Sequence, residues 1–170
     1  MIGNVFSRMR QIRQLLLLLP LTLFAFLPAH AGHKPPQLLL RIYVQTSGDG
    51  LPATQVTTIT VPPNGEQILI RTIPEVSEHD LADVRVDAAG STYLILTHRG
   101  KVNLDAVTGQ NQGRLLVVML NGYVIYAPVI DEQLSSGVFI IPHPLPPEVI
   151  KALQDIAKDN IKNGQPQLGP

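Results

Sequence analysis

Five histidines are the side chains of this sequence best suited to bind a metal ion or to transfer a proton near neutral pH. They are His30, His33, His79, His98 and His143. None occurs in an H-x-x-x-H or H-E-x-x-H pattern, the spacings by which one helix directs two imidazoles toward one ion. We therefore expect no metal ligand among them and interpret them as solvated histidines.

A loose run of carboxylates is the second group that could do chemistry. It comprises Glu75, Glu78, Asp80, Asp83 and Asp87. Paired carboxylates could serve hydrolysis or bind a hard cation, but this spacing fits neither an EF-hand loop nor a fixed carboxylate pair. Negative charge at a helix start and at strand ends explains most of the run. A metal-binding or hydrolytic protein using Glu75–Asp87 is the less favoured alternative.

The other common motifs of catalysis and cofactor binding are missing. The chain has no cysteine, which excludes disulfides, thiolate metal ligands and cysteine nucleophiles. No serine lies in G-x-S-x-G, and the sequence has neither G-x-G-x-x-G nor a Walker A motif. We therefore predict no catalytic residue, no cofactor and no metal ion, in a protein that is not an enzyme.

The charges are unevenly distributed along the chain. Basic and acidic residues number 13 each, but residues 1–31 contain three arginines and no acid, so the remaining chain has a net charge of −3. A mildly acidic chain without a basic cluster cannot replace the counterions of a nucleic acid. Nucleic acid is therefore excluded as an expected partner.

The N-terminal 31 residues have the pattern of a signal peptide. Three arginines precede an apolar run over residues 15–27, and the small-residue triplet Ala29-His30-Ala31 follows. The alternative is a permanent membrane anchor, but this run has 13 residues and a membrane span needs about 20. We expect an exported protein, periplasmic or secreted, that meets the membrane only through an uncleaved leader. Residues 32–36 are then a short extended lead.

Alternating and continuous apolar runs predict the strands of the mature chain. They cover residues 38–46, 56–61, 68–71, 83–87, 92–96, 114–120, 123–128 and 137–141. Asn-Gly pairs at 64–65 and 121–122 predict tight turns between strands, because both residue types tolerate positive φ.

Two stretches have helical periodicity instead. Residues 98–110 are expected to form one helix with Thr97 as N-cap, and residues 148–161 to form a second helix behind a proline-rich connector. A short helix is also expected to start at Ser77. Strands and helices in this order predict a single α+β domain over residues 37–163, with a mostly antiparallel sheet and two helices packed on one face. Residues 164–170 are expected to form a flexible tail.

Two tyrosines follow the second Asn-Gly turn in the strand that Pro128 ends or places at an edge. If this strand lies at a sheet edge, its backbone and side chains could accept an added polypeptide strand. The candidate binding residues are Tyr123, Tyr126, Pro128 and Ile130. Ordinary cross-strand packing is the alternative interpretation of the same residues.

The second half of the chain carries a motif of glycines, a tight turn and a proline at fixed intervals. Its main positions are Gly100, Gly113, Asn121, Gly122, Ala127, Pro128 and Gly137. In order and spacing, residues 76–160 resemble the head subdomain in the first periplasmic region of SecD-type protein-export components. Two departures are Pro142-His143, where that family has glycine, and the segment Leu96–Gly100 at the helix start. Residues 38–73 have no counterpart in the pattern.

The resemblance implies the SecD head fold and an affinity for extended or unfolded polypeptide. It does not imply a motor, because no later stretch of the sequence approaches the length of a membrane span. We therefore expect an exported, non-catalytic domain that binds polypeptide or an envelope partner in connection with protein export. The alternative is a structural or accessory envelope protein that binds no client.

Overall fold

A computed structural model describes residues 38–164 of the chain. The predicted signal peptide, the extended lead and nearly all of the predicted tail therefore lie outside the described residues. Gly164, expected in that tail, is the last residue of a helix. No helix within residues 38–164 has both the length and the hydropathy needed to cross a membrane.

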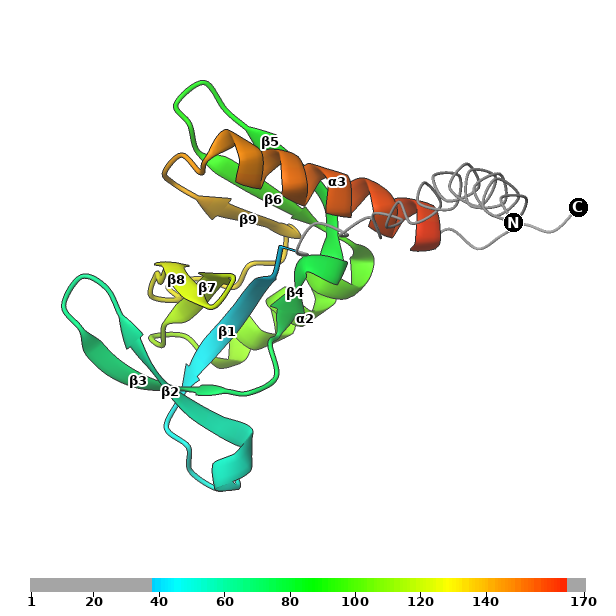
Figure 1. The fold of residues 1–170 in the computed structure, drawn as a ribbon. Coiled ribbons are helices and arrows are strands. Elements are labelled where there is room, and N and C mark those ends of the chain that lie inside the picture. The colour runs from blue at the N-terminus through cyan, green and yellow to red at the C-terminus, as the bar shows by residue number, and fades with distance from the viewer. Residues whose placement is uncertain (1–37, 165–170) are drawn as a thin grey trace, which may run out of the picture. The chain divides into compact units, whose positions relative to one another are not determined.

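The larger of two sheets contains β1 at its centre (Figure 1). Its strands follow one another in the order β2-β3-β1-β7-β8, and the short β4 also pairs with β1. All of these pairs are antiparallel. The strands are β1 (Leu40–Thr46), β2 (Val56–Val61), β3 (Glu66–Arg71), β4 (Val76–Ser77), β7 (Leu116–Leu120) and β8 (Tyr123–Tyr126).

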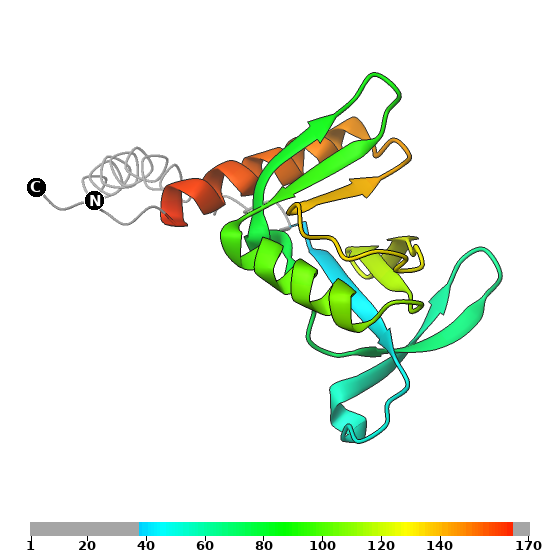
Figure 2. The ribbon, with the colours of Figure 1, turned by 180° about the vertical axis from the view of Figure 1, so that it is seen from behind.

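The smaller sheet has the order β5-β6-β9 and is also antiparallel. Its strands are β5 (Leu81–Val86), β6 (Thr92–Leu96) and β9 (Val138–Ile141). The helices are α2 (His98–Gln110) and α3 (Pro147–Gly164), with 3₁₀ turns η1 (Ala53–Gln55) and η2 (Glu78–Asp80). α2 connects β6 of the smaller sheet to β7 of the larger sheet and is seen from behind in Figure 2. The expected α+β class with mostly antiparallel pairing and two helices is confirmed.

The strands divide between two sheets because two connections prevent continuous pairing. The 3₁₀ turn η2 separates β4, which pairs with β1, from β5, which begins the smaller sheet. Residues 127–137 separate β8 from β9, and a segment of this length does not fold back as a tight hairpin. β8 and β9 consequently remain at the ends of their sheets.

One apolar core joins both sheets and both helices. Its buried side chains include Ile42 of β1, Leu94 of β6, Leu104 of α2 and Leu153 of α3, none of which is exposed. A second, smaller cluster packs the β2–β3 hairpin against the face of β1 and β7 that points away from this core, around Tyr43, Ile68, Ile70 and Val117. Residues 38–73, which the family pattern did not cover, therefore supply the central strand of the fold.

The Asn121-Gly122 turn forms as predicted. Both residues have positive φ, 49° and 86°, so the turn needs these residue types. Asn121 also has a role that its sequence position does not reveal. Its Oδ1 accepts a hydrogen bond from the Leu39 N–H at 2.9 Å, and its own N–H donates to the Leu39 carbonyl at 2.9 Å. The turn thereby fixes the start of β1.

The start of α2 is also as predicted, with the Thr97 hydroxyl accepting a hydrogen bond from the Gly100 N–H at 3.3 Å. Gly100 is buried because α2 approaches η2 closely there. A Cβ at Gly100 would lie 2.8 Å from the Asp80 Cβ, 3.1 Å from the Asp80 carbonyl oxygen and 3.2 Å from the Leu96 Cβ. Near the other end of α2, a Cβ at Gly109 would meet the Gln133 side chain at 3.1 Å.

We expect Gly100→Ala to lower the free energy of unfolding by about 1–2 kcal/mol. Overpacking against backbone and Cβ atoms costs about 1–3 kcal/mol, and the better helix propensity of alanine returns up to about 1 kcal/mol. Gly109→Ala is the matched control in the same helix. Because the flexible Gln133 amide can move aside, this variant should be neutral or slightly stabilising. Urea unfolding measures both, and equal stabilities would contradict the close approach at Gly100.

Candidate functional site

A hollow of about 280 Å³ lies between β8 and β9, the end strands of the two sheets. Apolar side chains make up most of its wall. β8 and the segment after it contribute Tyr126, Pro128, Val129 and Ile130, and β9 contributes Val138, Phe139 and Ile140. The hollow is therefore bordered on two sides by strands that each pair with a neighbour on one side only.

The chain remains paired with the β7 side after β8 ends at Tyr126. The Pro128 carbonyl accepts a hydrogen bond from the Leu116 N–H at 2.9 Å, and the Ile130 N–H donates to the Arg114 carbonyl at 2.8 Å. The main-chain groups of Pro128 therefore face β7, and the N–H that proline lacks would have pointed to that side and not to the free edge. Since neighbouring residues alternate in direction, the main-chain groups of Ala127 and Val129 point toward the free edge.

The same argument identifies the free groups of β9. The Gly137 carbonyl accepts a hydrogen bond from the Leu96 N–H at 2.9 Å, so Gly137 faces β6. By alternation, Val138 and Ile140 direct their N–H and carbonyl groups away from β6. The Val138 N–H donates to the Ser136 hydroxyl at 3.1 Å and the Val138 carbonyl accepts from it at 3.4 Å, so the free groups are those of Ile140. The side chain of Phe139 is buried, whereas Ile140 is 45% exposed. Both edges of the hollow thus carry main-chain donors and acceptors that pair with no strand of residues 38–164.

The Tyr126 ring connects the two edges. Its centroid lies 6.2 Å from that of Phe139 on β9 and 5.9 Å from that of His143, with the His143 ring nearly perpendicular. Tilted and edge-on arrangements are the favourable ones for aromatic pairs. These contacts hold Tyr126 as part of the wall.

The structure brings three of the four candidate binding residues together. Tyr126 and Pro128 are half-buried in the wall, and Ile130 is buried at its base. Tyr123 does not line the hollow; it is 77% exposed next to the Asn121-Gly122 turn. Phe139 and its neighbours on β9 were not predicted from the sequence as site residues. The run at residues 137–141 predicted a strand, but no sequence signal placed that strand beside β8.

The hollow is acidic at one end. Asp131 and Glu132 contribute to its wall, and no lysine or arginine of the described residues does. Both acidic residues are exposed, so they attract cations through solvent without a large desolvation cost. The site therefore favours an apolar ligand that carries positive charge at one end.

The remaining motif residues have structural positions. Gly113 and Gly137 have φ of 80° and 79°, a conformation that side chains with a Cβ rarely adopt. Ala127 packs against the second apolar cluster, on the opposite face of β8 from Tyr126. These residues shape the turns and the packing around the hollow.

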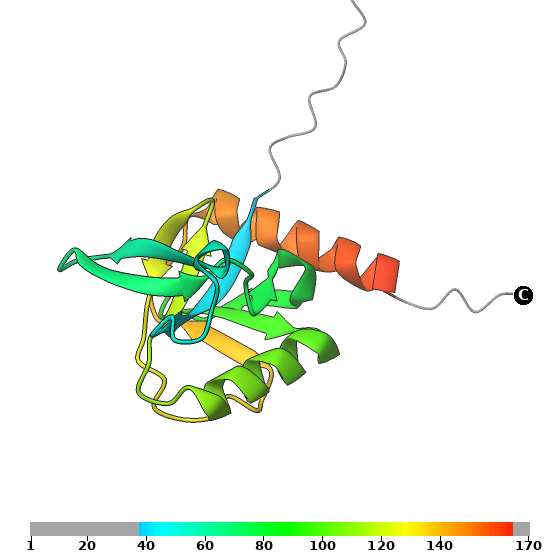
Figure 3. The ribbon, with the colours of Figure 1, turned by 90° about the horizontal axis from the view of Figure 1, so that it is seen from below.

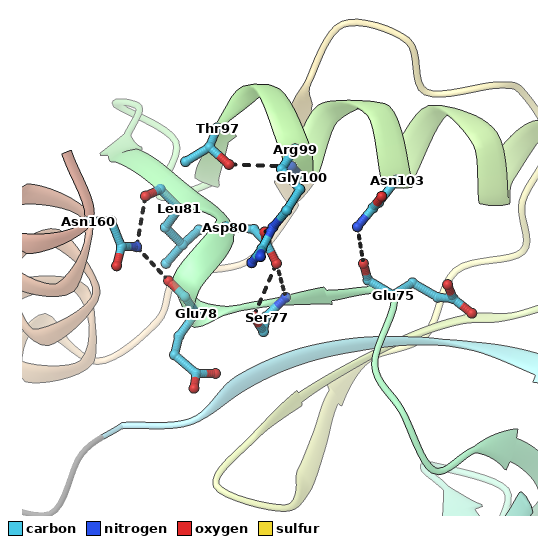
Figure 4. Close-up of polar contacts among 10 residues, drawn as sticks. All are labelled: Glu75, Ser77, Glu78, Asp80, Leu81, Thr97, Arg99, Gly100, Asn103 and Asn160. Carbon is cyan, nitrogen blue, oxygen red and sulfur yellow. Dashed lines mark hydrogen bonds and ion pairs between the residues drawn. The ribbon is translucent and has the colours of Figure 1, made fainter. Parts of the chain in front are cut away.

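The first half of the acidic run forms a polar junction at the start of α2 (Figure 4). The buried Asp80 carboxylate accepts hydrogen bonds from the Ser77 N–H at 2.9 Å, the Ser77 hydroxyl at 3.1 Å and the Arg99 Nε–H at 2.7 Å. Glu75 forms an ion pair with Arg71 at 3.7 Å. The expected short helix at Ser77 is the 3₁₀ turn η2, and Asp80 is its polar centre.

Glu78, also in η2, has a buried carboxylate whose Oε2 has no hydrogen-bond partner among residues 38–164. Its carbonyl accepts a hydrogen bond from the Asn160 amide at 2.8 Å, and the same amide donates to the Leu81 carbonyl at 2.9 Å (Figure 4). The Asn160 amide therefore ties α3 to the chain just before β5.

The second half of the run stabilises the β5–β6 hairpin. The Arg85 guanidinium, 2.8 Å away, lowers the pKa of Asp83. Hydrogen bonds from the Ser91 N–H, the Tyr93 hydroxyl and the Ala89 N–H lower the pKa of Asp87. Within residues 38–164 no three histidine, aspartate or glutamate side chains gather as metal ligands would. The carboxylates of the run do not converge.

The comparisons with known proteins support the fold. No protein-family profile matches the chain, and no curated protein does. One solved structure, of a SecDF membrane component described as enhancing protein export, is 22% identical with a TM-score of 0.51, covering 72% of this chain and 62% of its own. SecDF in a super-membrane-facing form is 21% identical with a TM-score of 0.51, covering 72% of this chain and 19% of its own.

These matches extend over more of the chain than residues 76–160, the span of the sequence motif. This chain nevertheless spans less than two thirds of the first structure and about a fifth of the second. At these identities the likeness concerns the fold. The predicted resemblance is confirmed at that level: the chain has the α+β fold of a segment of SecDF.

Proposed function

We propose that this protein is an exported, non-catalytic domain that binds an extended polypeptide segment between β8 and β9, in connection with protein export. The observation that carries the proposal is that two free strand edges border one apolar hollow. The likeness to SecDF structures, one of them described as a component that enhances protein export, supports the choice of an unfolded polypeptide as the ligand.

Binding would proceed by strand addition. The main chain of the ligand would pair with Ala127 and Val129 on one edge or with Ile140 on the other, where the Val138 groups are already bonded to the Ser136 hydroxyl. Alternate side chains of an extended strand point to opposite faces, so every second residue would enter the hollow. Its volume of about 280 Å³ is at the lower end of small-molecule sites and suits a few apolar side chains.

The test uses a fluorescent peptide of alternating valine and threonine with lysines at one end, titrated with the purified protein by fluorescence anisotropy. Val129 is 57% exposed and Ile140 is 45% exposed, so lysine is tolerated at either position without loss of core packing. We expect Val129→Lys combined with Ile140→Lys to weaken binding at least tenfold, because charge would replace apolar wall at both edges.

Ile73→Lys is the matched control, since Ile73 is 74% exposed in the connection between β3 and β4 and lies outside the hollow. It should bind as the parent does. Equal binding by the double variant would place the ligand elsewhere. If the parent protein binds no unfolded peptide but recovers an envelope protein on crosslinking, the accessory function is favoured instead.

A further inference from the structure

β2 forms the other end of the larger sheet, opposite β8. It pairs with β3 along all six of its residues, in a hairpin that projects from the rest of the described chain (Figures 1 and 3). No strand of residues 38–164 pairs with its outer side. Thr57, Thr58 and Thr60 are exposed there. The edge is accessible to another strand along its whole length.

The hydrogen bonds at the two ends of β2 identify which main-chain groups are free. The Gln55 carbonyl accepts from the Thr72 N–H at 2.9 Å and the Val61 carbonyl accepts from the Gly65 N–H at 3.2 Å, so both face β3. Odd-numbered residues therefore pair within the hairpin. By alternation, the main-chain groups of Val56, Thr58 and Thr60 point outward.

This edge lacks the features by which proteins usually protect an end strand. Charged side chains, prolines and bulges normally interrupt such edges. The sequence of β2, Val-Thr-Thr-Ile-Thr-Val, contains no charge and no proline, and all six residues are β-branched. Its pairing with β3 is regular throughout. Pro62 follows directly and limits any added strand to the length of β2, because it has no N–H to donate.

A second copy of β2 fits this edge in one antiparallel register. With the two-fold axis at Thr58, Thr58 lies opposite its own copy and Val56 opposite Thr60, so every outward group of the strand is paired. An axis at Ile59 would set Val56 opposite Pro62, which cannot donate. In the register at Thr58, Thr57 lies opposite Ile59 of the other copy, over the second apolar cluster. All opposed pairs are then β-branched, a favourable cross-strand combination.

We propose that two copies of this chain associate through β2, with Thr58 at the two-fold axis, so that their larger sheets become continuous. A neutral, β-branched strand meets no charge repulsion from its own copy, and the two-fold symmetry closes the assembly as a dimer. Because two chains must meet, the fraction of dimer rises with protein concentration. This association is independent of ligand binding between β8 and β9.

The chain has no cysteine, so single introduced cysteines report the register directly. Under mild oxidation, Thr58→Cys should form an intermolecular disulfide, because opposed residues of a hydrogen-bonded pair have Cα atoms about 5.5 Å apart. Thr57→Cys is the matched control. Its own copy lies two residues away along the strand, beyond about 7 Å. We expect at least tenfold more disulfide dimer for Thr58→Cys, and efficient crosslinking when Thr57→Cys is mixed with Ile59→Cys.

Sedimentation equilibrium of the cysteine-free protein gives the second measurement. Thr58→Pro removes an outward N–H and no hydrogen bond to β3, and proline is tolerated in edge strands. The β2–β3 hairpin should therefore remain and the dimer should dissociate at least tenfold more readily. An unchanged urea midpoint shows that the variant is folded. A monomeric parent protein, a dimer that persists in Thr58→Pro, or equal crosslinking at positions 57 and 58 would each overturn the proposal.

Discussion

Leu153→Ala is expected to lower the free energy of unfolding by about 3–4 kcal/mol. Leu153 has no exposed surface and packs from α3 into the core shared by both sheets. Truncation of a buried leucine removes apolar contacts and leaves a cavity, which together cost about 2–5 kcal/mol. Leucine and alanine have similar helix propensities, so the loss reports the docking of α3. Urea unfolding should show a lower midpoint with an unchanged slope.

Ile161→Ala in the same helix is the matched control. Ile161 is 43% exposed, so its truncation removes little buried surface. Surface substitutions change stability by about 0.5 kcal/mol or less, and alanine favours the helix slightly. If Ile161→Ala cost as much as Leu153→Ala, α3 would not dock through the residues described above.

Asp80→Ala is expected to cost about 2–3 kcal/mol. Asp80 is 3% exposed, and its carboxylate accepts three hydrogen bonds, two from Ser77 and one from Arg99. Its removal leaves the donors of Ser77 without an acceptor, which costs about 1–3 kcal/mol for a buried polar group. The side chain of Arg99 is 68% exposed and can return to water, so the full cost of breaking a buried ion pair does not apply.

Asp155→Ala tests whether this loss is specific to the buried junction. Asp155 accepts a hydrogen bond from the Lys151 Nζ at 2.8 Å, but the side chains of Asp155 and Lys151 are 52% and 77% exposed. Exposed pairs one helical turn apart contribute about 0.3–0.5 kcal/mol. Chemical denaturation of the two variants should separate them clearly. Similar losses would mean that the junction at η2 does not hold the start of α2.

The local structure of the chain could be predicted from short sequence patterns. α2 spans the predicted residues 98–110 with Thr97 as its cap, because capping and glycine signals act over a single helical turn. The Asn121-Gly122 turn was predictable because few residues adopt positive φ. The short helix expected at Ser77 is the 3₁₀ turn η2, where Ser77 donates to a buried carboxylate.

The candidate site could be predicted only in part. The Asn121-Gly122 turn and Pro128 predicted Tyr126, Pro128 and Ile130 as binding residues, and these three do line the same hollow. The same reasoning included the exposed Tyr123, because sequence alternation does not say where a strand lies in a sheet. Phe139 and Ile140 were not predicted, since their place beside β8 depends on contacts between segments more than ten residues apart.

The sequence by itself determined the two helices, the strands other than β4, the Asn121-Gly122 turn and the α+β class, because these depend on periodicity and on backbone preferences of neighbouring residues. The tertiary structure decided that the strands form two sheets, that β1 is central, and that β2, β8 and β9 are left with free edges. Which strand ends a sheet depends on long-range pairing and on the connections between strands. No local pattern of residues encodes that choice.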